Sequence, residues 1–217
     1  MKVLKFGGTS VGTVENIQNI ATILKDYNDI AVVVSAFGGT TDQLLEITNL
    51  AEKGDQKYQE ILEKIEKRHL AAIKDLIQDL ELQEQTSKQV LKTLSELKDI
   101  VQGVFLIKEA SLRTRDLIMS FGERLSAFII SKYLNADFLD TRKLIKTDSN
   151  FSYAKVDFSH SNKNIQNHFS QLQPNEDGSK KLQIATGFIA SNNENETTTL
   201  GRGGSDYTAS ILAAALN

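Results

Sequence analysis

The run Ile30-Ala31-Val32-Val33-Val34, followed directly by Ser35-Ala36-Phe37-Gly38-Gly39, decides the fold of this 217-residue chain. An unbroken apolar run rich in β-branched residues is typical of a strand buried on both faces of a parallel sheet. The glycine-containing loop after it ends the strand and leads into a helix predicted from about Asp42 to Glu52. This order of strand, glycine loop and helix predicts an α/β fold.

The first residues of the chain show the same order. Lys2 to Phe6 is predicted to form a short strand, Gly7-Gly8 a turn, and Thr13 the N-cap of a helix running to Leu24. Two such units in succession predict a right-handed βαβ arrangement with ligand-facing loops at the carboxyl ends of the strands. We therefore expect a mostly parallel sheet between two layers of helices.

Residues 55–110 carry a different pattern. Two apolar stripes at helical spacing, separated by a break near Gln85-Thr86-Ser87, predict an antiparallel helical hairpin inserted into this fold. We assign the hairpin to packing and no chemistry, with support of a dimer as the alternative. Gly122 lies within the next predicted helix, so we expect another part of the chain to pass close to its backbone or a helix to begin there.

The remaining elements follow from periodicity and turn residues. They are helices over about 111–134, 162–172 and 205–216, strands over 137–140, 144–147 and 182–189, and a polar loop over 192–197.

Composition excludes several classes of function. The formal net charge of −3 argues against a general nucleic-acid binder. The chain has no cysteine, which excludes disulfides and thiolate chemistry, and its histidines, His69, His160 and His168, are too scattered to predict a metal site. The apolar run at the N-terminus is too short for a signal peptide, and no segment resembles a membrane span. We expect a cytoplasmic protein with no membrane partner.

Two glycine motifs near opposite ends of the chain carry candidate chemistry: Lys5-Phe6-Gly7-Gly8-Thr9-Ser10 and Gly201-Arg202-Gly203-Gly204-Ser205-Asp206. Backbone N–H groups at such strand-to-helix turns can bind an anion. Lys5 adds a mobile cation, and Arg202 can bind a carboxylate through two parallel hydrogen bonds. The set suits transfer of a phosphoryl group to a small charged acceptor. The alternative is an ordinary turn at one motif and a capped flexible loop at the other.

Two further candidates come from the middle of the chain. Glu123 places a carboxylate beside a glycine within an apolar helix, where it could receive an ammonium group. The alternative is an ion pair with Arg124 or another surface cation. Thr41 heads a predicted helix, where capping is the alternative.

The motifs taken in order resemble those of the aspartate kinases, of the amino-acid kinase superfamily, over all 217 residues. The order is Lys-Phe-Gly-Gly-Thr-Ser at 5–10, Val-Val-Ser-Ala-Phe-Gly-Gly-Thr-Thr-Asp at 33–42, Gly-Glu at 122–123, Gly-Phe at 187–188 and Gly-Arg-Gly-Gly-Ser-Asp-Tyr-Thr-Ala at 201–209. The hairpin resembles that of longer members, including those fused to homoserine dehydrogenase. The resemblance implies phosphorylation of the side-chain carboxylate of L-aspartate by ATP with Mg²⁺, giving 4-phospho-L-aspartate. This reaction is the first step toward lysine, threonine and methionine.

The resemblance also implies roles for individual residues and a possible homodimer. Lys5 and Asp206 would be the catalytic residues, with Lys5 on the transferring phosphoryl group. Gly7, Gly8, Ser10 and Gly204 would approach the phosphates. Arg202 would hold the α-carboxylate of aspartate, and Glu123, helped by Asp206, its ammonium group. Thr41 and Ser205 would position the reacting carboxylate, and Phe188 would contact the substrate.

Members of this family continue with a strand and loops that hold adenine and ribose. We therefore expect residues 1–217 to be a catalytic domain incomplete at its C-terminus, with little or no kinase activity of its own. Two alternatives stay open: another amino-acid kinase, acting on glutamate, N-acetylglutamate, carbamate or UMP, and a non-catalytic aspartate-binding fragment.

Overall fold

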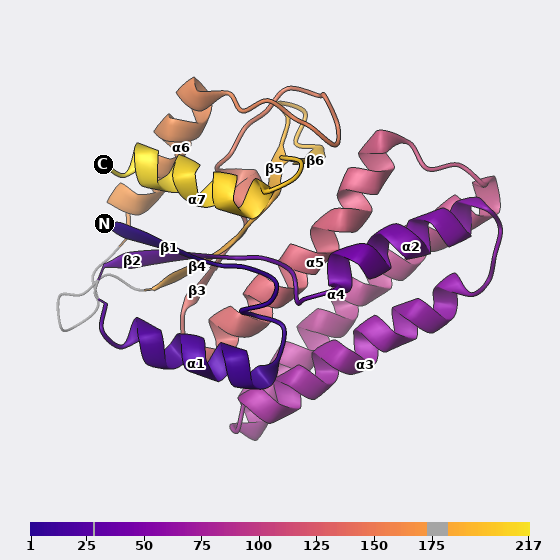
Figure 1. The fold of residues 1–217 in the computed structure, drawn as a ribbon, viewed down its shortest axis with the longest axis horizontal. Helices are drawn as coiled ribbons and strands as arrows, with labels where there is room; N and C mark the ends of the chain where they lie inside the picture. The colour runs from indigo at the N-terminus through magenta and orange to yellow at the C-terminus, as the bar shows by residue number, and fades with distance from the viewer. Residues whose placement is uncertain (28, 173–181) are drawn as a thin grey trace.

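A parallel sheet forms the centre of the molecule. The computed structural model describes residues 1–27, 29–172 and 182–217. The sheet has the order β1 (Lys2–Phe6), β2 (Ile30–Val34), β4 (Gln183–Thr186) and β3 (Asp137–Leu139), and every neighbouring pair is parallel. Figure 1 shows the sheet between helices above and below it. The predicted α/β fold with a mostly parallel sheet is confirmed.

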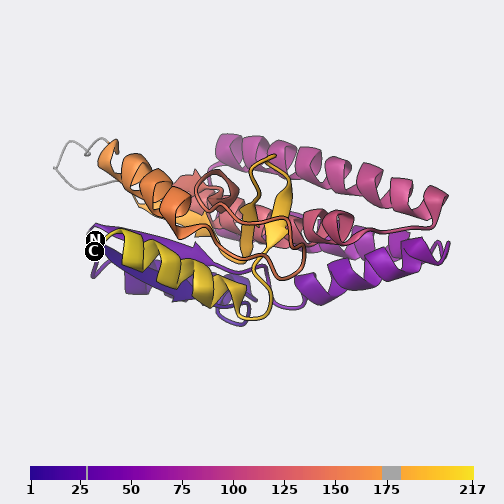
Figure 2. The same ribbon diagram turned by 90° about the horizontal axis from the view of Figure 1, so that it is seen from above.

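The two faces of the sheet pack against different helices. Val32 and Val34 of β2 share one core with α1 (Val14–Leu24) and α5 (Leu112–Tyr133). Ala31 and Val33, which point to the opposite face, share a second core with α6 (Phe158–Ser170) and α7 (Gly204–Ala215). This alternation explains why β2 reads as an unbroken apolar run. Figure 2 shows the layers from above.

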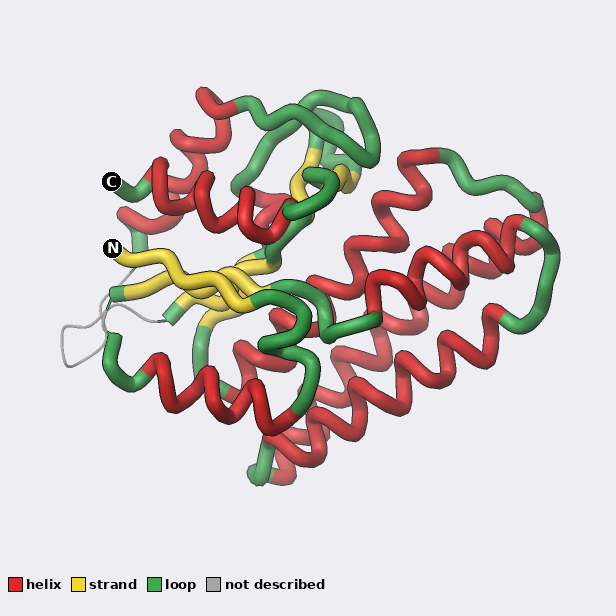
Figure 3. Tube along the Cα trace, viewed as in Figure 1, coloured by secondary structure: helices red, strands yellow, loops and turns green. Residues whose placement is uncertain are grey.

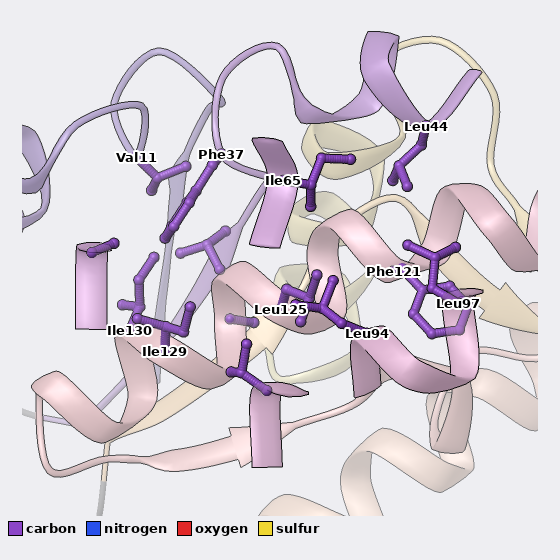
Figure 4. Packing of buried hydrophobic residues seen from close by; sticks show 14 of the residues in the cluster. Val11, Phe37, Leu44, Ile65, Leu94, Leu97, Phe121, Leu125, Ile129 and Ile130 are labelled. Carbon is purple, nitrogen blue, oxygen red and sulfur yellow. The ribbon is translucent and has the colours of Figure 1, made fainter. Parts of the chain in front are cut away.

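A helical half adjoins the sheet. It contains α2 (Thr40–Glu52), α3 (Tyr58–Leu76), α4 (Leu80–Ile107) and α5. Large apolar side chains from these helices interlock in one core, and those labelled in Figure 4 include Leu44, Ile65, Leu94, Leu97 and Phe121. None of the helices in the described residues has an apolar stretch long enough to cross a membrane.

The inserted hairpin is present, but its break was predicted at the wrong place. Helix α3 ends at Leu76 and α4 begins at Leu80, with the side chain of Asp79 accepting a hydrogen bond from Leu82 N at 2.8 Å. Gln85-Thr86-Ser87 lies inside α4, because the Asp79 cap starts the helix earlier than the polar run suggested.

The single strand predicted over 182–189 was also wrong. The chain forms β4, turns at Gly187-Phe188 and continues as β5 (Ile189–Ser191). Phe188 has φ of 67°, and its N–H donates to Oγ1 of Thr208 in α7 at 3.0 Å. Strand β5 pairs antiparallel with β6 (Thr197–Thr199), which begins within the predicted polar loop. The contact between Phe188 and α7 therefore accompanies a turn that divides the apolar run 182–189 into two strands.

Residues 144–147 do not form the predicted strand. The described backbone makes only isolated bridges there, from Lys146 to Ser191 and from Thr147 to Val156, after a 3₁₀ turn over Thr141–Lys143. Helix α6 begins at Phe158, earlier than predicted, because the side chain of Asp157 accepts a hydrogen bond from His160 N.

The close approach predicted at Gly122 is confirmed. A Cβ atom there would lie 2.8 Å from Cβ of Ala36, in the loop after β2. Helix α5 therefore packs against that loop through backbone, which places the next residue, Glu123, beside the carboxyl end of β2.

Candidate functional site

A cleft of about 340 Å³ opens at the carboxyl ends of β1, β2 and β4. The loops that follow these strands meet there, between the sheet and the helical half, as the trace in Figure 3 shows. The lining residues are Lys5, Gly8, Ser35 to Gly39, Thr41, Glu123, Phe188 and Gly201 to Asp206. Ligands bind at this edge in open α/β sheets, as the two strand–loop–helix units predict.

Most residues singled out from the sequence line this one cleft. They are Lys5, Gly8, Thr41, Glu123, Phe188, Arg202, Gly204, Ser205 and Asp206. Gly7 lies beside the Lys5 side chain, since a Cβ atom on it would be 3.2 Å from Nζ of Lys5. Ser10 instead lines a separate hollow against α1, with Phe6 and Asn16 among its neighbours. The structure therefore does not bring Ser10 to the cleft, and its contact with phosphates stays a prediction.

An ion pair joins the two glycine motifs. Nζ of Lys5, at the end of β1, lies 2.8 Å from Oδ1 of Asp206 in the first turn of α7. The lysine side chain is largely buried, whereas that of Asp206 is 71% exposed. A cation and an anion from opposite ends of the chain thus share one corner of the cleft.

The Glu123 side chain lies in the wall of the cleft and is only partly hydrogen-bonded. The residue is 3% exposed, and its Oε1 accepts a hydrogen bond from Ala36 N at 3.2 Å. Its Oε2 is buried and has no hydrogen-bond partner among the described residues. Burial raises the pKa of this carboxyl to about 8, against the opposing effect of the Ala36 N–H. A buried oxygen without a partner at a cleft wall suits a cationic ligand group.

The alternative ion pair for Glu123 is wrong. Arg124 points away from it and pairs with Glu96 of α4 at 2.9 Å. The Arg124 guanidinium also lies 4.3 Å from the ring centroid of Phe121. Consecutive residues of α5 therefore serve different purposes, with one facing the cleft and the other joining α5 to α4.

Gly204 of the second motif and Gly187 nearby have no room for a side chain. A Cβ atom on Gly204 would lie 2.7 Å from the Phe188 ring, and one on Gly187 would lie 2.6 Å from Cβ of Ser205. Gly201 and Gly203 have φ near +73°, a conformation that favours glycine. The Arg202 side chain is exposed at the cleft and has no ion-pair partner within the described part of the chain. It is therefore available to an anionic ligand.

Sequence reasoning missed two residues that shape this site. Asp116 of α5 is 2% exposed and accepts hydrogen bonds from Ser152 N at 2.8 Å and from N and Oγ1 of Thr199, each at 2.9 Å. Burial raises its pKa, against the opposing hydrogen bonds. It anchors the strand that leads into Gly201. An aspartate on the apolar face of an amphipathic helix was the available signal.

Arg68 of α3 is the second missed residue. Its guanidinium donates hydrogen bonds to the carbonyl oxygens of Gly38 and Gly12, which belong to the loops after β2 and β1. The charged face of the hairpin was interpreted as solvated, and only the fold brings this arginine to the loops.

The charges of the cleft suit a small zwitterionic acid. Arg202 and Lys5 supply cations, Glu123 supplies a buried carboxyl, and Thr41 and Ser205 supply hydroxyl groups. Within the described residues, no group of three or more His, Asp or Glu side chains is placed to hold a metal ion.

Comparisons with known proteins agree with this geometry. The model of the amino acid kinase family matches residues 1–217. The bifunctional aspartokinase/homoserine dehydrogenase of Buchnera aphidicola is 36% identical over the whole chain, and the aspartokinase of Chlamydia trachomatis is 34% identical over 97% of it. The chain spans 27% of the first relative and 45% of the second.

Solved structures show the same fold. E. coli aspartokinase III in complex with lysine and aspartate is 29% identical with a TM-score of 0.86, and its complex with aspartate and ADP gives 0.84 at 28% identity. Each match covers the whole of this chain and 47% of the E. coli chain.

Proposed function

Because the chain belongs to the amino acid kinase family, we propose that it forms the aspartate-binding part of an aspartate kinase. The reaction is transfer of the terminal phosphoryl group of ATP to the side-chain carboxylate of L-aspartate, giving 4-phospho-L-aspartate. One observation carries the proposal: the same small cleft is lined by a buried oxygen without a hydrogen-bond partner among the described residues, Oε2 of Glu123, and by an exposed arginine, Arg202. Aspartokinase relatives and structures support the choice of substrate.

Each charge of aspartate has a partner in the cleft. We assign the ammonium group to Glu123, which releases its proton on binding because its pKa without ligand is about 8, with Asp206 in support. We assign the α-carboxylate to Arg202. Phe188 contacts the substrate beside them. In this arrangement the side-chain carboxylate of aspartate faces the hydroxyl groups of Thr41 and Ser205.

The reacting groups meet near the ion pair. Thr41 and Ser205 position the side-chain carboxylate, and Lys5 neutralises charge on the phosphoryl group as it transfers. Asp206 holds the Lys5 ammonium in place through their ion pair. Phosphoryl transfer depends on positioning and charge neutralisation, and these residues supply both.

The nucleotide side of the proposal rests on the glycine turns. Gly7, Gly8 and Gly204 leave backbone close to Lys5 and to the start of α7, where a helix N-terminus favours an anion. We propose that Mg²⁺ enters with the phosphates of ATP. We also propose that the protein acts in the cytoplasm as a homodimer, and that its product leads to lysine, threonine and methionine.

Calorimetric titration of the chain with L-aspartate and succinate tests the proposal. Succinate keeps both carboxylates and lacks the ammonium group, so we expect it to bind at least tenfold more weakly. Glu123→Gln should remove this preference, while Glu84→Gln, an exposed change on α4, should keep it. Equal affinity of the unchanged chain for both acids would contradict the assignment of Glu123.

A wider panel separates the alternatives. Tighter binding of L-glutamate, N-acetylglutamate, carbamate or UMP would indicate another amino-acid kinase. Titration with Mg-ATP follows. Saturable binding of aspartate with no binding of nucleotide would favour an aspartate-binding role without catalysis by these residues.

A further inference from the structure

We propose that Arg68, on the inserted hairpin, is a positioning residue that fixes the separation of the two glycine loops and thereby tunes ligand binding in the cleft. The substrate named in its test rests on the proposed function. The contact with the loops is independent of it.

Arg68 bonds to both loops at once. Its Nη1 donates to Gly38 O at 2.6 Å, and its Nη2 donates to Gly12 O at 2.8 Å. The two carbonyl groups belong to the segments that follow β2 and β1. A planar guanidinium can bridge two acceptors in this way, whereas the single ammonium of lysine cannot reproduce the fork. Hydrogen bonds from a charged donor are also stronger than neutral ones.

The two loops meet through backbone atoms. A Cβ atom on Gly38 would lie 3.0 Å from Gly8 O, and one on Gly8 would lie 3.4 Å from Ala36 O. The loops therefore touch through backbone, and the Arg68 guanidinium binds one carbonyl oxygen from each loop beside this contact. Both loops line the cleft, through Gly8 on one side and Ala36 to Gly39 on the other.

Helix α3 holds the second loop in another way. The Phe37 ring lies 5.8 Å below the Arg68 guanidinium and stacks on the His69 ring, with centroids 4.9 Å apart and planes at 10°. His69 is fully buried, and its Nδ1 lies 2.7 Å from Ile65 O. Burial lowers its pKa to about 4, so a neutral ring packs against Phe37 at physiological pH. Arg68 and His69, which are consecutive in α3, thus both contact the loop after β2.

Ala36 connects the loop held by α3 to the ligand side of the cleft. This residue lies next to Phe37, and its N–H donates to Oε1 of Glu123. Movement of the loop would change how Glu123 is held, and with it the place assigned to the ligand ammonium. The hairpin therefore acts on the cleft through Arg68 as well as packing beside it.

Amide hydrogen exchange measured by NMR without ligand tests the contact between Arg68 and the loops. Val11 N and Gly12 N bond to Gly7 O and Thr9 O in the first loop, and Thr40 N bonds to Phe37 O after the second. In Arg68→Met, which keeps the aliphatic stem, we expect these amides to exchange at least tenfold faster. Arg68→Lys should give a smaller increase. Lys67→Met, an exposed neighbour on α3, is the matched control and should leave them unchanged.

Chemical rescue and ligand affinity complete the test. A hollow of about 200 Å³ lies beside Arg68, lined by Val11, Gly12 and Phe37 among others, so methylguanidinium has access to the vacated place in Arg68→Met. We expect it to slow exchange in both loops and to restore part of a roughly tenfold loss in L-aspartate affinity.

Three results would overturn the proposal. They are unchanged exchange in both loops, an equal increase over the whole chain in both Arg68 variants, and faster loops with unaltered aspartate affinity. Failure of the unchanged chain to bind aspartate would instead remove the proposed substrate, and the loop exchange with its rescue would still decide the role of Arg68.

Discussion

Replacing Glu123 by glutamine should change how the stability of the protein depends on pH. The folded state raises the pKa of this carboxyl from an ordinary value of 4.5 to about 8 because the side chain is buried. Between these values the folded protein keeps the proton and the unfolded chain releases it. The stability contributed by this group is therefore complete below pH 4.5 and is lost progressively as the pH rises to 8.

The size of this effect follows from the two pKa values. Each pH unit between them lowers the free energy of unfolding by up to ~1.4 kcal/mol. From pH 5 to pH 8 the loss amounts to about 3–4 kcal/mol in the unchanged protein. Glutamine keeps the shape and the acceptor for Ala36 N but carries no titrating proton. The free energy of unfolding of Glu123→Gln should therefore rise by about 3–4 kcal/mol relative to that of the unchanged protein as the pH goes from 5 to 8.

Urea unfolding, followed by circular dichroism at half-unit steps from pH 5 to pH 8.5, measures this difference. Glu84→Gln, which removes an exposed carboxylate on α4, should give a curve parallel to that of the unchanged chain. Parallel curves for Glu123→Gln and the unchanged chain would refute the reasoning, since they would mean that Glu123 titrates alike in the folded and unfolded states.

Three other changes have direct expectations. Arg202→Ala should weaken binding of L-aspartate and of succinate alike in calorimetry, by about tenfold or more, because both acids lose a charged partner; an effect on aspartate alone would argue against a carboxylate site. Gly122→Ala should lower the free energy of unfolding by about 1–3 kcal/mol, since the new Cβ would lie 2.8 Å from Cβ of Ala36; a stability equal to that of Gly103→Ala, where a Cβ meets nothing within 4 Å, would contradict it. Asp116→Ala should cost about 1–3 kcal/mol, because the N–H groups of Ser152 and Thr199 would lose their buried acceptor; unchanged unfolding in urea would show that these bonds contribute little.

Local patterns in the sequence predicted the sheet and its ligand-binding edge. The bounds of β1 and β2 follow from their apolar runs, and the glycine loops after them do form one cleft. The position of Glu123 in the cleft wall agrees with its sequence signal, a carboxylate beside Gly122 within an otherwise apolar helix. These features depend on neighbours in the chain, which the sequence shows directly.

Features that depend on distant partners escaped prediction. Phe188 breaks a continuous apolar pattern through its bond to Thr208, and no property of residues 182–189 indicates that turn. Arg68 looks like any charged residue on a solvated helix face until the fold places Gly12 and Gly38 against it. Ser10 belongs to a motif whose other members reach the cleft, yet the turn directs it to α1. Such cases need the tertiary structure.

The strand order of the central sheet has a consequence for the order in which the chain folds. Strand β2 pairs with β4, Val34 with Thr186, although the whole helical half lies between them in sequence. Helices α2 to α5 follow one another directly in sequence and pack on one another, so their contacts close shorter loops than the pairing of β2 with β4 does. Closing the long loop between β2 and β4 carries an entropic cost that those contacts help to offset. The helical half is therefore expected to assemble first and to act as the template on which the sheet closes, so that the cleft matures only in the last step of folding.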